Sequence, residues 1–400
     1  MIFLHRVASH FECKEIIMAK RKLFRLALSL ALCIGIMPAS AAFASESEIP
    51  DNYVVFTEDM AKTAAEDFSE AVNPGGRLTA GEPVKFYDLE GNAIGYTVNY
   101  YKDGASAGYV VFDNGDESLI SQYSFSSESM SPTDVAVEYA SDQPSVLSDS
   151  PDGHLKNYKI GPFSYAVIDE NTGEGITNYG EEIAIAEVAP LSSTPDSGSW
   201  QNPNIWIPYG SNPGNYALGE GRNIGSSIAF PERDIESMTG TYACVISALL
   251  PSVFYYGAPA DIKTAYGALW DLSGTTVDHV SNGITYGSTK YANAGPAFKT
   301  YMSNYHGINV NYRFVEGPNY QFFKSMINGG NIGVFGANIL VNGNYPGHGV
   351  SVQGYQTMLD RNQNLLMETL VVFDGWYAGW ANINLNYAGY TATYGISFSR

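Results

Sequence analysis

The chain has 400 residues, a formal net charge of −20 and a hydrophobic fraction of 45%. Its length suits two domains plus a targeting segment, and its apolar content is ordinary for a globular protein. The strong negative charge argues against binding to nucleic acid or to an anionic membrane surface, because these partners are themselves negatively charged.

The first 44 residues predict a secretory signal peptide. Basic residues at positions 20–25 precede an apolar run at 26–36, and small residues at 39–44 suit cleavage by a signal peptidase. The apolar run is too short to cross a membrane, so we expect no membrane span. The pattern favours a secreted protein of bacterial type, either extracellular or at the cell surface.

Residues 45–190 predict a small acidic α+β domain. Up to position 199 this region carries 28 acidic and 6 basic residues, a net charge of −22, whereas residues 200–400 have a net charge of −2. Thr57–Val72 is predicted to be a helix with Thr57 as its N-cap and with Met60 and Phe68 on its apolar face. Strand-like runs separated by turn residues follow it. The step in charge indicates two units with different roles.

Residues 191–221 are rich in Ser, Pro, Gly and Asn, which predicts a linker and the start of the second unit. We place that second unit at residues 200–400. It contains predicted helices at 259–272, 294–305 and 319–328, followed by predicted strands at 332–335, 349–355 and 366–373. This succession of helices and strands again favours an α+β fold.

Cys244 is the only cysteine that remains once the signal peptide, with Cys13 and Cys33, is removed. A disulfide within one chain is then impossible, and a lone thiol in a secreted protein indicates pairing between chains or chemistry. Cys244 stands directly before a predicted apolar helix, where orphan backbone N–H groups and the helix dipole favour a thiolate. We therefore predict that Cys244 is a nucleophile; a small buried core residue is the alternative. Pro251 is expected to kink or end this helix.

Two further residues could supply a base and an orienting group for that thiol. His348 stands between two glycines, directly before an alternating strand pattern, and Asp374 follows the next strand in an Asp-Gly-Trp sequence. If the two strands are antiparallel neighbours, Asp374 reaches the imidazole of His348 and Trp376 covers the pair. Taken alone, each motif is more typical of a turn or a surface residue. Their order along the chain favours a Cys-His-Asp site.

Together these segments resemble the papain-like cysteine peptidases, and most closely the streptopain family of secreted bacterial proenzymes. The resemblance rests on Gly240–Ala248, Phe254–Pro259, Gly347–Val350 and Asp374–Trp376. It implies a papain-like catalytic domain over residues 200–400, in which a helical part carries the nucleophile helix and packs with an antiparallel sheet. A small α+β prodomain would precede that domain.

The resemblance also implies the roles of the site residues. Cys244 would attack a peptide carbonyl, His348 would stabilise the thiolate and later protonate the leaving amine, and Asp374 would fix the tautomer of His348. The segment Trp200-Gln201-Asn202-Pro203 is similar to the one that supplies an oxyanion-hole glutamine in the family, which gives this role to Gln201. Many papain-like enzymes carry a glutamine about six residues before the cysteine, a position that Met238 occupies here.

We therefore expect a secreted cysteine endopeptidase that is made as a proenzyme, cuts protein or peptide substrates, and uses no cofactor or metal. The acidic domain, especially Pro83–Ser126, looks like the family's propeptide and would be the enzyme's own intramolecular inhibitor. Two alternatives remain open: a thiol-dependent amidase or acyltransferase acting on cell-wall peptide, and a catalytically decayed secreted binding protein on the same scaffold. His279 could ligate a metal, but no HExxH motif or Cys/His cluster accompanies it.

Overall fold

The computed structural model describes residues 53–114, 118–142, 154–184, 205–208, 213–225, 228–341, 343–344 and 346–400. These ranges contain seven α-helices and a large, mostly antiparallel sheet of sixteen strands, so the predicted α+β class is confirmed. The predicted signal peptide at 1–44 and residues 191–204 of the predicted linker lie outside the described residues.

Capping groups in the sequence set several helix boundaries. The Thr57 side chain accepts a hydrogen bond from the Met60 N–H at the start of the first helix, as predicted, and Gly240 ends a later helix in the left-handed conformation. The helices are α2 (Glu58–Val72), α3 (Pro132–Asp142), α5 (Glu232–Thr239), α6 (Cys244–Tyr255), α7 (Ile262–Ser273), α8 (Tyr291–His306) and α9 (Tyr320–Asn328), with a short 3-10 helix η1 (Pro213–Asn215).

The large sheet runs through both halves of the sequence. Its main path is β10 (Glu182–Ala184), β9 (Glu174–Thr177), β8 (Ser164–Asp169), β7 (Leu155–Gly161), β3 (Val84–Tyr87), β4 (Ala93–Lys102), β5 (Ala105–Asp113), β6 (Ile120–Ser124), β20 (Ala381–Asn384), β19 (Leu365–Phe373), β18 (Gly347–Leu359), β17 (Gly333–Ile339), β21 (Tyr390–Ser399) and β16 (Asn311–Glu316). Two further strands, β2 (Thr79–Ala80) and β12 (Ala217–Asn223), pair with β4 and β18. The pairing of β3 with β7 is parallel, and the others in this sheet are antiparallel.

Two smaller sheets complete the described strands. The first joins β1 (Tyr53–Val55) to β11 (Trp206–Pro208). The second contains β13 (Thr241–Tyr242), β15 (Ile284–Ser288) and β14 (Thr276–Ser281). Because β13 lies directly before α6, its parallel pairing with β15 fixes the segment that leads into Cys244.

We call residues 53–184 the N-terminal part and residues 205–400 the C-terminal part. Within the large sheet, the pairing of β6 with β20 joins the two, with Gln122 opposite Ile383 and Tyr123 opposite Asn382. Contacts unite residues 52–400 in one compact unit. The domain boundary near residue 190 therefore stays a prediction, since no break in contacts marks it.

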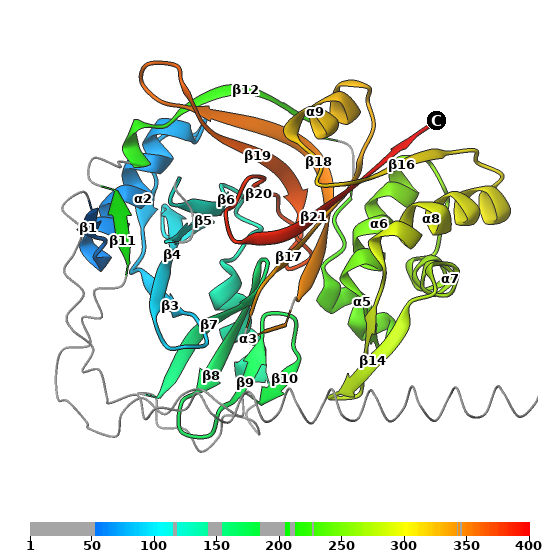
Figure 1. Ribbon diagram of the computed structural model, residues 1–400, viewed down its shortest axis with the longest axis horizontal. Coiled ribbons are helices and arrows are strands. Elements are labelled where there is room, and N and C mark those ends of the chain that lie inside the picture. Colours follow the sequence, from blue (N-terminus) through cyan, green and yellow to red (C-terminus); the bar gives the residue numbers. More distant parts are fainter. Residues whose placement is uncertain are drawn as a thin grey trace, which may run out of the picture. The chain divides into compact units, whose positions relative to one another are not determined.

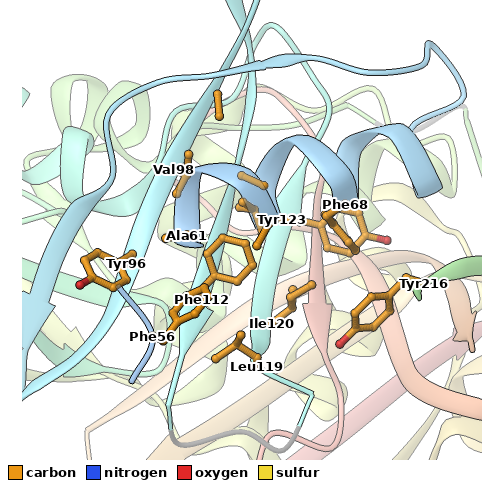
Figure 2. Close-up of a cluster of buried hydrophobic side chains, with 14 of the residues drawn as sticks. Phe56, Ala61, Phe68, Tyr96, Val98, Phe112, Leu119, Ile120, Tyr123 and Tyr216 are labelled. Carbon is orange, nitrogen blue, oxygen red and sulfur yellow. The ribbon is translucent and has the colours of Figure 1, made fainter. Parts of the chain in front are cut away.

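The apolar face of α2 packs into a core built from both parts (Figure 2). The ring of Phe68 meets Tyr123 edge-on at 5.1 Å and Tyr216 edge-on at 5.5 Å, measured between ring centroids. The buried face of α2 is set by Ala61 and Phe68, whereas Met60 is 37% exposed. The predicted helix is thus confirmed, but Met60 does not lie on its buried face.

Helices α6 and α8 lie beside the C-terminal strands of the sheet, and α7 packs against both helices (Figure 1). Residues 245–253 of α6 are all buried, and the helix continues through Pro251 to Tyr255. Of the two outcomes expected at Pro251, an end of the helix is wrong, because burial on every side holds a helix that has lost one backbone hydrogen bond. Within the described ranges, no helix is both long and apolar enough to cross a membrane.

Candidate active site

Cys244 is the first residue of α6. The chain leaves α5 at Gly240, whose φ of 69° suits a residue without a side chain, and Ala243 then adopts an extended conformation as the helix N-cap. The carbonyl oxygen of Ala243 accepts hydrogen bonds from the N–H groups of Ile246 and Ser247 at 2.9 and 3.0 Å. The thiol therefore lies at a helix N-terminus, as the sequence predicts.

The Cys244 thiol is half-buried between α6 and β18. Burial and the nearby charge of Glu232 raise the pKa of Cys244 to about 12, whereas backbone N–H groups, first among them that of Gly349, lower the pKa of the thiol. A Cβ atom at Gly349 would lie 3.1 Å from the Val245 side chain, so the close approach of the strand to the helix favours glycine there. In this structure the group is consequently a neutral thiol.

His348 lies on β18 and is only 1% exposed. Its Nε2–H donates a hydrogen bond of 2.8 Å to the backbone carbonyl of Asp374, which leaves Nδ1 with the lone pair that can take a proton. The ring stacks on Trp376 at a centroid distance of 4.6 Å and an angle of 21°, and Phe163 of the N-terminal part meets it edge-on at 6.2 Å. Burial lowers the pKa of His348 to about 4, so the imidazole is neutral above that pH.

Asp374 lies beside His348, as predicted, but its backbone carbonyl and not its carboxylate makes the hydrogen bond to the ring. One carboxylate oxygen accepts the Trp376 N–H at 3.1 Å, and the other accepts the Tyr109 hydroxyl of the N-terminal part at 3.4 Å. Burial raises the pKa of Asp374 to about 6. The paired register of β18 and β19 ends at Ser351 and Phe373, so Asp374 lies just beyond the paired residues. At that point the backbone carbonyl of Asp374, rather than its side chain, reaches the ring of His348.

Cys244 and His348 line one cavity of about 390 Å³. Both parts of the chain contribute to its walls, and those from the N-terminal part are Ile160, Ser164, Tyr179 and Glu181. Among the hydrogen bonds of the described residues, none joins the Cys244 sulfur to the ring of His348. The three predicted residues thus lie close together, but the thiol and the imidazole are not hydrogen-bonded to each other in this structure.

Gln201 lies outside the described residues. Met238, which occupies the alternative position before the cysteine, is 39% exposed on α5. The backbone N–H of Cys244 at the start of α6 is therefore the described donor that could face an oxyanion.

Sequence reasoning missed two buried carboxyl groups on α5, Glu232 and Glu236. Burial, and next to it the charge of Glu236, raises the pKa of Glu232 well above its usual value, and burial raises the pKa of Glu236 to about 8. The backbone N–H of Glu232 donates to the carbonyl of Gly375 at 2.7 Å, which ties α5 to the segment after Asp374. Their spacing of four residues, which places both on one helix face, was the available signal.

His279, for which metal ligation was the only role considered from the sequence, also lines this cavity. Its Nε2 lies 2.6 Å from a carboxylate oxygen of Glu181, and its ring stacks on Tyr286 at 4.8 Å and 4°. The described residues contain no group of three or more His, Cys, Asp and Glu arranged to hold a metal ion. Through its contact with Glu181, His279 joins the C-terminal part to the N-terminal part at the wall of the cavity.

Comparison with known proteins adds no family assignment. No protein-family model matches the sequence, and a search of curated proteins finds no match.

Proposed function

We propose that the chain is the precursor of a secreted cysteine endopeptidase with a papain-like catalytic domain, as the resemblance to the streptopain family implies. One observation carries the proposal: a thiol at a helix N-terminus and a histidine with one ring nitrogen fixed line the same cavity. A nucleophile, a base and a group that orients the base are the requirements of thiol catalysis. The predicted signal peptide would direct the chain out of the cell.

The chemistry would proceed by proton transfer and covalent attack. His348 Nδ1 takes the proton of the Cys244 thiol, and the thiolate adds to the carbonyl carbon of a peptide bond. The proton then passes to the departing amine, which leaves a thioester on Cys244. Water, deprotonated by His348, cleaves the thioester and restores the thiol.

Asp374 would be a positioning residue in this mechanism. Its backbone carbonyl holds the Nε2–H of His348 and stabilises the imidazolium that forms when Nδ1 takes a proton. The stacked ring of Trp376 excludes water from that hydrogen bond. The N–H of Cys244 would face the oxyanion, with Gln201 as the second donor that the resemblance implies.

The N-terminal part would act as the intramolecular inhibitor. It supplies four residues to the walls of the cavity, and Phe163 packs on the catalytic imidazole. In this covered state the pKa of the thiol is about 12 and that of His348 about 4, so neither group is charged near neutral pH. Removal of the N-terminal part would let water reach both groups, which lowers the pKa of Cys244 and raises that of His348 toward an ion pair.

The test compares three versions of the chain from Ser45 onward: wild type, Cys244→Ala and His348→Ala. Wild type should cut the chain between its two parts under reducing conditions, degrade the N-terminal part, and then digest casein and react with a thiol-directed epoxide inhibitor. Both variants should stay intact and inert, whereas His154→Ala, a control at an exposed histidine, should behave as wild type. A wild-type chain that neither processes itself nor reacts with the inhibitor contradicts the proposal.

A further inference from the structure

An aromatic slot beside the catalytic pair is filled by Tyr179 of the N-terminal part. The ring of Tyr179 stacks on Tyr242 at 5.2 Å and 27°, and on Trp376 at 6.0 Å and 22°. Tyr286 meets it edge-on at 6.4 Å. These are the offset and edge-on arrangements that aromatic rings prefer, and they favour a ring over an aliphatic side chain of similar volume.

Two walls of the slot lie next to the catalytic residues, one in the sequence and one by ring stacking. Tyr242 lies two residues before Cys244, and Trp376 stacks on His348 at 4.6 Å. Tyr242 is also paired with Tyr286 across β13 and β15, with their rings 5.3 Å apart. These walls all belong to the C-terminal part: Tyr242 and Tyr286 lie on β13 and β15, and Trp376 lies in the segment between β19 and β20.

The turn that carries Tyr179 is held firmly in place. The Glu181 carboxylate lies 2.6 Å from His279, and the Tyr179 N–H donates to the Thr177 hydroxyl at 3.3 Å. Gly180 has a φ of 78°, and a Cβ atom there would lie 2.7 Å from the Tyr139 ring, so the turn tolerates little variation. The rigid turn therefore holds the Tyr179 side chain in one position in the slot.

We propose that Tyr179 holds the place of a substrate side chain, and that the exposed slot takes an aromatic residue next to the scissile bond. This inference rests on the proposed function for the statement that the ligand is a peptide. It gives the peptidase a preference for Phe, Tyr or Trp at one position, because an aliphatic residue forgoes the two stacking contacts. Discrimination by one such pocket is typically about 10–200-fold.

The test opens the slot in the full chain and needs no catalysis. In a Cys244→Ala background, Tyr179→Ala removes the ring that fills the slot, whereas Tyr179→Phe keeps it filled. N-acetylphenylalaninamide and N-acetylleucinamide are titrated into each chain and followed by protein NMR. Tyr179→Ala should bind the phenylalanine amide at least about tenfold more tightly than the leucine amide, and Tyr179→Phe should bind neither.

Equal binding of the two amides by Tyr179→Ala, or binding by neither, overturns the inference. Tyr179→Val serves as a second opening variant if near-UV circular dichroism shows that Tyr179→Ala has lost its fold. Aromatic binding by a chain whose wild-type thiol is inert upholds the slot and contradicts the proposed function. An active peptidase that cuts phenylalanine and leucine peptides with equal kcat/KM upholds the proposed function and overturns the slot.

Discussion

Among single residues, Glu232 has the most direct influence on the Cys244 thiol. Burial raises the pKa of Cys244 to about 12, and the negative charge of Glu232 is the next largest cause. Glu232→Gln removes the charge that this carboxyl carries above its own raised pKa, so the pKa of Cys244 should fall in that pH range. Alkylation by iodoacetamide in the intact chain, at a pH above the pKa of Glu232, should then be about 3–10-fold faster for each unit by which the pKa of Cys244 falls. The rate of alkylation as a function of pH measures the shift.

Asp234→Asn is the matched control, because Asp234 lies on the same helix and is exposed. Its alkylation profile should coincide with that of wild type. An unchanged profile for Glu232→Gln, or an equal shift in both variants, would show that Glu232 does not act on the thiol.

The candidate site was only partly predictable at this scale. Cys244 and His348 follow from local signals, a thiol before an apolar helix and a histidine before an alternating strand. The prediction brings Asp374 to the imidazole through its side chain, whereas the structure shows contact through its backbone carbonyl. The end of the strand register decides which of these groups reaches the ring. The four-residue spacing of Glu232 and Glu236 places both on one helix face but does not show that this face is buried, and Tyr179 has no local signal, since the contacts of Glu232 and Tyr179 join segments that are distant in the sequence.

Among the elements, α2 makes the clearest case for a stability measurement. Phe68 is fully buried and packs on rings from both parts of the chain, so Phe68→Ala should lower the free energy of unfolding by about 3–5 kcal/mol. Met60→Ala on the same helix should change it by less than about 0.5 kcal/mol, because Met60 is 37% exposed. Guanidinium unfolding of the intact chain gives both values, and equal losses would contradict this assignment of the core.

Element existence was predictable where the signal is local. The predicted helices at 259–272 and 294–305 correspond to α7 and α8, within a few residues at their ends. The continuation of α6 through Pro251 was not predictable, because it depends on neighbours that bury the helix on every side. Helix propensity depends on a few neighbouring residues, whereas burial of a helix depends on contacts with segments from the whole fold.

At the scale of the whole molecule, the order of strands in the large sheet could not be predicted from the sequence. The pairing of Gln122 with Ile383 links segments more than 250 residues apart, and nothing in either segment specifies its partner. The parallel pairing of β3 with β7 in the large sheet is also non-local, because it places Phe86 opposite Asn157. The consequence is a core in which Ile205, Ile207 and Tyr216 of the C-terminal part pack with the N-terminal part.

This shared core predicts that a cut in the linker does not by itself separate the two parts. A chain nicked between residues 185 and 204 should elute as one species in native size-exclusion chromatography and as two fragments in guanidinium. The backbone N–H of Phe56 donates to the carbonyl of Ile205 at 2.7 Å, and Arg233 pairs with Glu138 at 2.9 Å, so hydrogen bonds and charge also hold the parts together. Immediate separation of the nicked chain would contradict a shared core.

Tyr387 makes that prediction quantitative. Its hydroxyl accepts from the buried Lys159 Nζ at 2.8 Å and donates to Asp113 at 3.2 Å, so it bridges a buried ion pair of the N-terminal part to the C-terminal part. Tyr387→Phe leaves that pair with one hydrogen-bonding group fewer, and should weaken the association of the nicked fragments by about 1–3 kcal/mol. Tyr305→Phe, at a tyrosine that is 57% exposed, should leave the association unchanged. The guanidinium concentration at which the fragments separate measures the difference. A shared midpoint for the two variants would show that Tyr387 does not help to hold the two parts of the chain together.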